Sequence, residues 1–300
     1  MTKTLISIVG PTAIGKTALS IKLAQCFDTD IVSADSRQFF KEMNIGTAVP
    51  SLEELNTATH YFIQHKSITE PYSVGDFERD AIRQIKTIHQ ENPYAIMVGG
   101  SGLYVKAVTN GLDDFPDVDS SIREKLNSEL AQNGLKSLQD QLEALDPKSY
   151  NTIAIYNPQR LLRALEICLG TGKPYSSFLT NTNKNRDFKT LSIGLDAERS
   201  LIYERINQRV DIMVENGLVE EVERLLPYKH LNALNTVGYK ELFQYFDGKD
   251  TLEFAISEIK KNTRRFAKRQ LTWFRKNKDT KWFDYQVDIK DIIDYVEKNA

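Results

Sequence analysis

Residues 10–17 read GPTAIGKT, which matches the pattern G-x-x-x-x-G-K-T of a phosphate-binding loop. Glycines at this spacing let the backbone turn tightly, so that successive N–H groups point toward one bound anion. Lys16 supplies a full positive charge, and the Thr17 hydroxyl is placed to bind a Mg²⁺ ion. The pattern therefore predicts a site for a phosphorylated ligand, with Thr17 as a metal ligand, and leaves the identity of that ligand open.

The segments on either side of this loop have the periodicity that the motif requires. Residues 5–9 form an apolar, β-rich run, and apolar residues at helical spacing follow the loop at Leu19, Ile21, Leu23 and Phe27. The loop would then lie between a strand and the N-terminus of a helix, where the helix dipole adds partial positive charge. An ordinary glycine turn is the competing interpretation, and the flanking strand and helix argue against it.

Asp35 follows a second short strand that contains Ile31 and Val32. Because ligands of open α/β sheets bind at the carboxyl ends of the strands, we expect Asp35 to lie beside the phosphate-binding loop. A surface turn or a helix cap would also suit this residue. A third strand, residues 94–98, runs into the sequence GGSG at 99–102, where the backbone can approach a ligand closely or pack against a helix.

The chain between residues 117 and 187 differs from the rest. It carries helical patterns and no strand, with helices expected at 120–134, 135–145 and about 158–170. Apolar runs then return as a fourth strand at 191–196 and an edge strand at 282–283. We therefore predict an α/β fold, a P-loop NTPase-like core with a parallel sheet flanked by helices. Residues 1–116 and 188–300 would form this core, and residues 117–187 would be an inserted all-helical domain.

The charge of the chain is distributed unevenly. The net charge is −2 at pH 7, yet residues 260–278 carry nine Lys or Arg and no acid. This segment is predicted to form part of one long helix from about residue 251 to 276, with aromatic residues interleaved among the cations. A local excess of cations favours a polyanionic partner such as RNA over a merely solvated helix face.

Composition limits the class of protein. An apolar content of 41% and a charged content of 27% are typical of a soluble globular chain. No apolar run approaches the roughly 20 residues of a membrane span, so we expect no membrane association. The first strand begins close to Met1, which leaves no room for a signal peptide, and two cysteines are too few for a disulfide framework. These features predict a cytoplasmic protein.

Nine segments of the chain, in this order, resemble the sequence blocks of the tRNA dimethylallyltransferases, also called tRNA isopentenyltransferases. The resemblance covers nearly the whole chain and is far more specific than the phosphate-binding loop alone. The segments are GPTAIGKT (10–17), SADSRQ (33–38), IGTA (45–48), YSVGDF (72–77), GGSGLY (99–104), QRLLRALE (159–166), QRVD (208–211), VGYKEL (237–242) and TRRFAKRQ (263–270).

The resemblance implies a reaction and its catalytic residues. The family transfers a dimethylallyl group from dimethylallyl diphosphate to N6 of adenosine 37 in tRNAs that read codons beginning with U. Asp35 would be the general base, and Arg209, Lys16 and a Mg²⁺ ion at Thr17 would stabilise the leaving diphosphate. The diphosphate would bind at Gly10, Pro11, Thr12, Ala13, Ile14, Gly15, Lys16 and Thr17.

The same resemblance implies a set of tRNA-binding residues. Adenosine 37 is stacked in the anticodon loop, so it must flip out to reach the site. The flipped base would be gripped by Asp35, Ser36, Arg37 and Gln38. The other tRNA-binding positions would be Ser101, Arg123, Gln159, Arg160, Leu161, Leu162, Arg163, Gly238, Tyr239, Arg264 and Lys268. The resemblance also implies a monomer of the bacterial type.

Two positions depart from the family pattern. His60-Tyr61 stands where many relatives have two adjacent histidines, and Ile14 stands where Ser is common. We assign no catalytic role to the first. The second leaves every phosphate-contacting feature of the loop in place.

Three other functions compete with this one. A kinase for a nucleotide or small molecule could use ATP at the same loop, with Asp196 as its metal-binding acid. A P-loop protein could bind RNA without catalysis. An adenylate isopentenyltransferase, which prenylates free AMP, would share the chemistry but would have no use for the basic helix.

Overall fold

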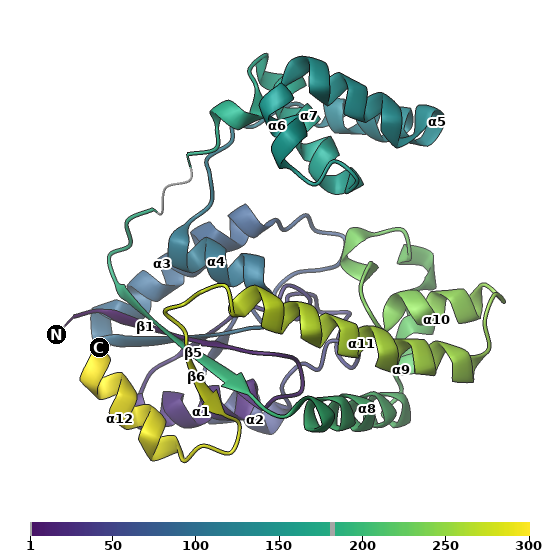
Figure 1. Cartoon of the computed structure of the whole chain (residues 1–300). Coiled ribbons are helices and arrows are strands. Elements are labelled where there is room, and N and C mark those ends of the chain that lie inside the picture. Colours follow the sequence, from purple (N-terminus) through teal and green to yellow (C-terminus); the bar gives the residue numbers. More distant parts are fainter. Residues whose placement is uncertain (1, 181–183) are drawn as a thin grey trace. The chain divides into compact units, whose positions relative to one another are not determined.

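The computed structural model describes residues 2–180 and 184–300, and these divide into two compact units (Figure 1). The core unit comprises Met1–Asn110 and Asn185–Ala300, and the helical unit comprises Gly111–Lys184. The sequence predicts boundaries after residues 116 and 187, a few residues further along. The first boundary comes earlier than predicted because Phe115 already belongs to the helical unit, where it stacks on Tyr175 with ring centroids 5.0 Å apart. The second comes earlier because Arg186 donates to the Val108 carbonyl oxygen of the core unit at 2.9 Å.

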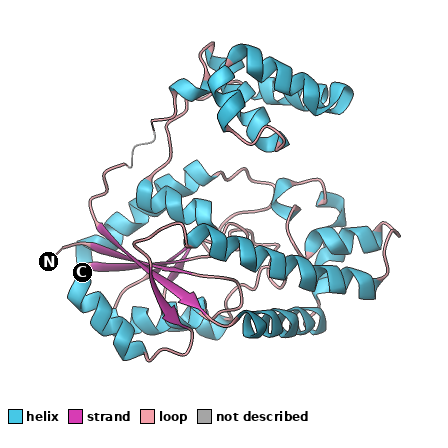
Figure 2. Cartoon of the chain, in the orientation of Figure 1, coloured by secondary structure: helices cyan, strands magenta, loops and turns pink. Residues whose placement is uncertain are grey.

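Six parallel strands form one sheet in the described part of the core unit, in the order β3-β2-β4-β1-β5-β6. They are β1 (Thr4–Val9), β2 (Ile31–Ser33), β3 (His60–Tyr61), β4 (Tyr94–Val98), β5 (Lys189–Asp196) and β6 (Lys281–Asp284). The predicted parallel sheet flanked by helices is confirmed, and Figure 2 shows the strands between helical layers. The edge strand at 282–283 is also confirmed. β3, at the other edge, was not predicted because two residues carry no readable alternation.

Successive residues of β1 face opposite helical layers. Leu5 and Val9 belong to a core that includes α3 (Val74–Glu91) and α4 (Gly102–Asn110). Ile6 and Ile8 belong to a second core that includes α1 (Lys16–Phe27) and α12 (Ile289–Asn299). Every residue of β1 is therefore buried, as expected for a central strand of a parallel sheet that is covered on both faces.

The remaining helices of the core unit cluster beyond the carboxyl ends of the strands (Figure 1). α8, α9, α10 and α11 pack against one another, and α11 is the long basic helix that the sequence predicts. Their bounds, with those of α2, are α2 (Leu52–Thr57), α8 (Arg199–Glu215), α9 (Leu218–Arg224), α10 (Tyr239–Phe246) and α11 (Leu252–Phe274). Short 3-10 turns occupy Leu226–Tyr228 and Asn232–Leu234. Among the described residues, no helix combines the length and apolar character needed to cross a membrane.

The helical unit contains α5 (Ser120–Leu145), α6 (Pro147–Thr152), α7 (Pro158–Thr171) and a 3-10 turn at Tyr175–Ser177. The predicted break at Gly134 is present within α5, where the glycine has φ 75°. α6 was not predicted. Its N-cap is Asp146, a 1% exposed carboxylate that accepts hydrogen bonds from Ser149 and Ser176. These bonds tie the short helix to the 3-10 turn, so its stability comes from contacts distant in sequence.

Candidate active site

The phosphate-binding loop, residues 10–17, lies between the end of β1 and the start of α1. Gly10 has φ 148°, and a Cβ atom there would lie 2.7 Å from the Leu195 carbonyl oxygen, so only glycine fits. Ala13 adopts φ 65° without being glycine, which indicates a loop whose shape the surrounding structure imposes. α1 begins at Lys16, and the unpaired N–H groups of its first turn point toward the loop.

Lys16 is a partly buried cation within this loop. Its Nζ donates a hydrogen bond to the Pro11 carbonyl oxygen at 2.8 Å. Desolvation lowers the pKa of Lys16 to about 8, while the nearby Asp35 carboxylate opposes this shift and the Arg209 guanidinium adds to it. An ammonium group that is desolvated beside a second cation favours a bound anion, because the anion supplies the missing counter-charge.

Arg209, on α8, faces the same loop from the other side of the site. Its Nη1 donates a long hydrogen bond of 3.4 Å to the Thr12 hydroxyl. Burial lowers the pKa of Arg209, and the neighbouring Arg205 lowers it further. Lys16 and Arg209 form no ion pair in the described part of the chain, and both line one small cavity of about 90 Å³ together with Thr17. The geometry therefore creates a compact site with an excess of positive charge.

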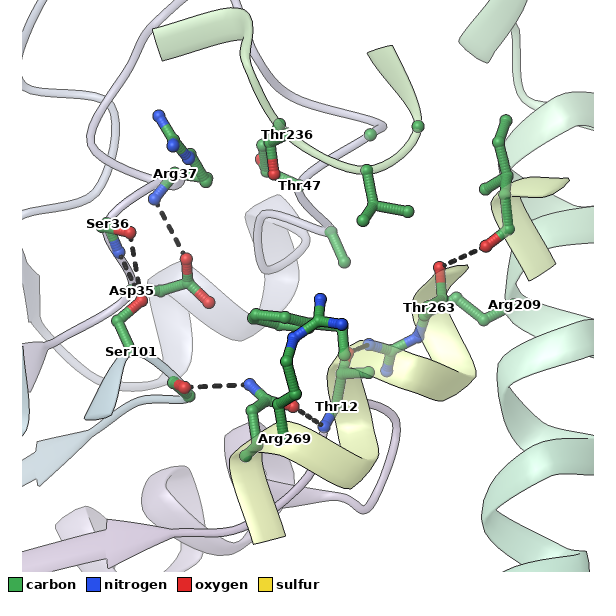
Figure 3. Close-up of a pocket in the computed structure, with 18 of the residues that line it drawn as sticks. Thr12, Asp35, Ser36, Arg37, Thr47, Ser101, Arg209, Thr236, Thr263 and Arg269 are labelled. Carbon is green, nitrogen blue, oxygen red and sulfur yellow. Dashed lines mark hydrogen bonds between the residues drawn. The ribbon is translucent and has the colours of Figure 1, made fainter. Parts of the chain in front are cut away.

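Asp35 lies just beyond β2 and beside the phosphate-binding loop, where its sequence position predicts it. Its Oδ1 accepts a hydrogen bond from the Arg37 N–H at 3.1 Å, an Asx turn that fixes the carboxylate. Within residues 2–180 and 184–300, Oδ2 accepts no hydrogen bond. Asp35 lines the small cavity and also an adjoining cavity of about 620 Å³, into which its carboxylate points in Figure 3. One oxygen of Asp35 is therefore available to a ligand.

Ser36 and Ser101 join the loops that follow β2 and β4. The Ser36 N–H donates to the Ser101 Oγ at 3.1 Å, and the two hydroxyl oxygens are also 3.1 Å apart (Figure 3). Both residues line the larger cavity. Ser101 therefore positions the residue next to Asp35, in addition to any contact that it makes with a ligand.

Arg37 and Gln38 bind backbone oxygens of neighbouring segments. The Arg37 Nη1 donates to the carbonyl oxygens of residues 232 and 233 at 3.0 and 2.9 Å. The Gln38 Nε2 donates to the carbonyl oxygens of residues 47 and 48 at 3.1 and 2.8 Å. These polar groups are engaged in holding the walls of the site, which the sequence alone did not indicate.

The two departures from the family pattern have different surroundings. His60 lines the small cavity, and its Nδ1 lies 2.8 Å from the Ala58 carbonyl oxygen. Burial lowers the pKa of His60, which favours a neutral ring at pH 7. The Tyr61 hydroxyl donates to Asp30 at 3.1 Å. Ile14 is 2% exposed and packs in the core, so its side chain does not face the ligand site.

One face of α11 forms a wall of the larger cavity. Its residues recur at helical spacing as Ile259, Thr263, Phe266, Gln270 and Trp273. The family resemblance implies RNA contacts for the cations Arg264 and Lys268 of this helix, and the face toward the cavity was not predicted. The spacing i, i+4, i+7, i+11 and i+14 is the sequence signal that could have found it.

The basic segment, residues 260–278, is less dominated by positive charge than its sequence indicates. Acids outside the segment neutralise some of its cations, through the pairs Lys260–Asp211, Lys261–Glu258 and Arg275–Asp196. The local excess of cations is therefore smaller than the sequence of this segment indicates, because carboxylates from α8, β5 and the preceding turn of α11 pair with three of them. Lys268 is exposed and makes no ion pair within the described residues. The Arg264 Nη1 donates to the Asn207 Oδ1 at 2.6 Å.

In the helical unit, the predicted tRNA-binding cations gather around Glu166. Arg123 and Arg163 both pair with this carboxylate, at 3.4 and 3.0 Å. The Arg123 Nη2 also donates to the Gln159 Oε1 at 2.6 Å. Arg160 and Gln159 are exposed on the first turn of α7 and are accessible to a nucleic acid.

Three residues predicted to bind tRNA have fully buried side chains. Leu161 and Leu162 are 0% exposed in the core of the helical unit, and Tyr239 is 0% exposed in the core unit. These three side chains are packed in the core and are not accessible to a nucleic acid, so a contact with tRNA at these positions would involve the main chain and stays a prediction. Gly238, with φ 97°, lines the larger cavity instead of the core.

The fold and the site define a P-loop protein of the α/β class, with a cationic cavity beside a carboxylate. Residues 38–277 match the family model described as IPP transferase. The chain is 62% identical over 297 residues to the tRNA dimethylallyltransferase of Christiangramia forsetii, covering 99% of this chain and 98% of that protein. It is 58% identical over 303 residues to the tRNA dimethylallyltransferase of Flavobacterium johnsoniae, covering 99% and 98%.

Solved structures of proteins with related names have the same fold as this chain. A tRNA isopentenylpyrophosphate transferase from Bacillus halodurans superimposes with a TM-score of 0.73 at 39% identity, covering 99% of this chain and 96% of that chain. A eukaryotic dimethylallyltransferase acting on tRNA superimposes with a TM-score of 0.83 at 26% identity, covering 100% and 81%. The chain belongs to the IPP transferase family, whose named relatives here are tRNA dimethylallyltransferases.

Proposed function

We propose that this chain transfers the dimethylallyl group of dimethylallyl diphosphate to N6 of adenosine 37 in tRNAs that read codons beginning with U, and releases diphosphate. The observation that carries the proposal is the small cavity in which Lys16 and Arg209 face Asp35. It combines a site for a strongly charged leaving group with a carboxylate oxygen that is free to take a proton. Membership of the IPP transferase family supports the same reaction.

Diphosphate gains negative charge as it leaves the prenyl group, and positive charge beside it stabilises the transition state. The N–H groups of the phosphate-binding loop, Lys16 and Arg209 would supply this charge and would bind the diphosphate. The depressed pKa of Lys16 in the free protein agrees with a cation that lacks its counter-ion. Lys16 and Arg209 each contact the phosphate-binding loop without a ligand, so both cations would already lie beside the diphosphate when it binds.

Mg²⁺ would fit beside this diphosphate. Thr17 and Asp35 place oxygen donors around the small cavity, and Mg²⁺ prefers oxygen ligands, usually one or two from the protein with the rest from phosphates and water. Thr17 would hold the ion, which would neutralise part of the diphosphate charge.

Asp35 would act on the nucleophile. N6 of adenine is weakly nucleophilic because its lone pair is delocalised into the ring, so attack on the prenyl carbon benefits from removal of the N6 proton. The free Oδ2 of Asp35 would accept that proton, and its Oδ1 stays fixed by the Arg37 N–H. A general base of this kind contributes about 10²–10⁴ in rate.

The larger cavity would receive the flipped adenine. Its volume of about 620 Å³ accommodates a base, and Phe266 and Trp273, each 38% exposed, offer rings for stacking. Exposed cations such as Lys268 and Arg160 would bind phosphates of the RNA. The enzyme would act as a monomer in the cytoplasm.

The kinase alternative is not favoured by the surroundings of Asp196. This carboxylate pairs with Arg275, and its Oδ1 accepts from the Ala197 N–H at 2.9 Å. Asp196 lines neither of the two cavities described above. A metal-binding acid of a kinase would instead face the phosphate-binding loop.

The test is incubation of the protein with labelled dimethylallyl diphosphate and Mg²⁺, with an anticodon stem-loop, AMP or ATP in separate reactions. We expect label on the stem-loop, at the adenosine that follows the anticodon. Label on AMP alone would contradict the assignment of tRNA as the substrate. Phosphoryl transfer from ATP without prenyl transfer would support the kinase instead.

A further inference from the structure

Gln270 links two segments that both line the active site. It lies on α11 and is 6% exposed. Its Oε1 accepts a hydrogen bond from the Thr12 N–H of the phosphate-binding loop at 2.9 Å. Its Nε2 donates to the Gly100 carbonyl oxygen, after β4, also at 2.9 Å. A single side chain therefore joins the diphosphate site to the loop after β4.

The chemistry of this position requires an amide. The Thr12 N–H can only donate and the Gly100 carbonyl can only accept, so the bridging side chain must offer one acceptor and one donor. Glutamate would keep the first bond and set a carboxylate against the carbonyl. Leucine would leave both the Thr12 N–H and the buried Gly100 carbonyl without their partner.

The link continues to Asp35 through Ser101. Ser101 follows Gly100, and its Oγ accepts from the N–H of Ser36, the residue next to Asp35 (Figure 3). The connection therefore runs from the phosphate-binding loop through Gln270, Gly100, Ser101 and Ser36 to the proposed base. Each step of this connection is one hydrogen bond or one peptide bond, so few rotatable bonds separate the phosphate-binding loop from Asp35.

We propose that Gln270 is a positioning residue that sets the separation between the diphosphate site and Asp35. This inference depends on the roles proposed above for the phosphate-binding loop and Asp35. During transfer the bond from C1 of the prenyl group to the diphosphate oxygen breaks, the C1–N6 bond forms, and the N6 proton passes to Asp35. The leaving oxygen and N6 flank the same carbon, C1, so both protein groups must be placed correctly relative to that atom, and a misplacement of 1 Å can cost about 10²-fold in rate.

The test compares Gln270→Leu and Gln270→Glu with the wild type and with Gln244→Leu. Gln244 is an exposed glutamine on α10 and controls for the loss of an amide. Three quantities are measured for each protein: the single-turnover rate with both substrates saturating, the Kd of inorganic diphosphate with Mg²⁺, and the Kd of the anticodon stem-loop. Hydrogen–deuterium exchange of a peptide that contains Thr12 reports the hydrogen bond of its N–H independently of activity.

We expect both Gln270 variants to lose about tenfold or more in single-turnover rate while each Kd stays within about threefold of the wild type. Exchange of the Thr12 N–H should rise in Gln270→Leu and stay near the wild-type rate in Gln270→Glu, whose carboxylate still accepts from this N–H. Gln244→Leu should match the wild type. A smaller loss of rate, or a loss of affinity that accounts for it, would overturn the inference.

Folding and the proposed function are controlled separately. If Gln270→Leu fails to fold, Gln270→Glu provides the test by the same criteria. If the wild type transfers label to the stem-loop and the Gln270 variants do so at its rate, only the positioning role fails. If the wild type transfers no label, the proposed function itself fails.

Discussion

The Tyr239 hydroxyl donates a hydrogen bond of 2.6 Å to the buried Glu221 carboxylate. The same carboxylate accepts from the backbone N–H groups of residues 44–46, at 3.1, 2.7 and 3.0 Å. Burial and the charge of Glu221 raise the pKa of Tyr239, so its hydroxyl remains a donor at neutral pH. α9 and α10 thereby hold the loop whose residues 46–48 line the larger cavity.

Tyr239→Phe should destabilise the protein without weakening its affinity for RNA. The variant removes one hydrogen bond from a buried carboxylate, which costs about 1.5–3 kcal/mol in the free energy of unfolding. Urea denaturation measures this loss, and titration with the stem-loop should give an unchanged Kd. Tyr228→Phe, at a 43% exposed ring, is the control and should change neither quantity. Weaker stem-loop binding at unchanged stability would show that Tyr239 contacts RNA directly.

Asp35→Ala should reduce turnover far more than tRNA affinity. Loss of the base should lower the single-turnover rate by about 10²–10⁴, while the stem-loop Kd changes by only a few-fold. The exposed Asp294→Ala on α12 controls for the loss of a carboxylate elsewhere. Equal losses in rate and in affinity would count against Asp35 as the base.

The affinity for diphosphate should fall as the pH rises through the pKa of Lys16. In the free protein this pKa is about 8, and a bound anion raises it, so binding is accompanied by proton uptake above pH 8. Between pH 7 and pH 9 the protonated fraction of Lys16 falls about tenfold, and the Kd for inorganic diphosphate should rise by a similar factor. Titration calorimetry in two buffers of different ionisation enthalpy measures the proton uptake. No proton uptake at pH 8.5 would contradict this prediction.

Lys268→Ala should weaken RNA binding and flatten its salt dependence. Lys268 is exposed and unpaired within the described residues, so its removal should reduce the slope of log K against log salt by about one. Lys260→Ala is a matched control on the same helix, because Lys260 already pairs with Asp211 at 2.5 Å. Its effect on the slope should be smaller. Equal slopes for wild type and Lys268→Ala would remove Lys268 from the phosphate contacts.

Local patterns were sufficient to predict the elements that carry the chemistry. The phosphate-binding loop is contiguous, so its glycines, Lys16 and Thr17 are visible without a fold. Asp35 could be placed because the carboxyl ends of parallel strands share one edge of a sheet. β3 and α6 were missed because each is short and depends on pairing with distant segments.

The family resemblance, the parallel sheet, the phosphate-binding loop and the longer inserted helices could be predicted without a structure, because each depends on residues close together in the chain. Which side chains face the site depends on packing between segments that are far apart in the chain. Gln270 and Thr12 are 258 residues apart, and no local periodicity pairs them. Burial of Tyr239 and neutralisation of Lys260 are likewise decided by packing, since both depend on partners from another helix.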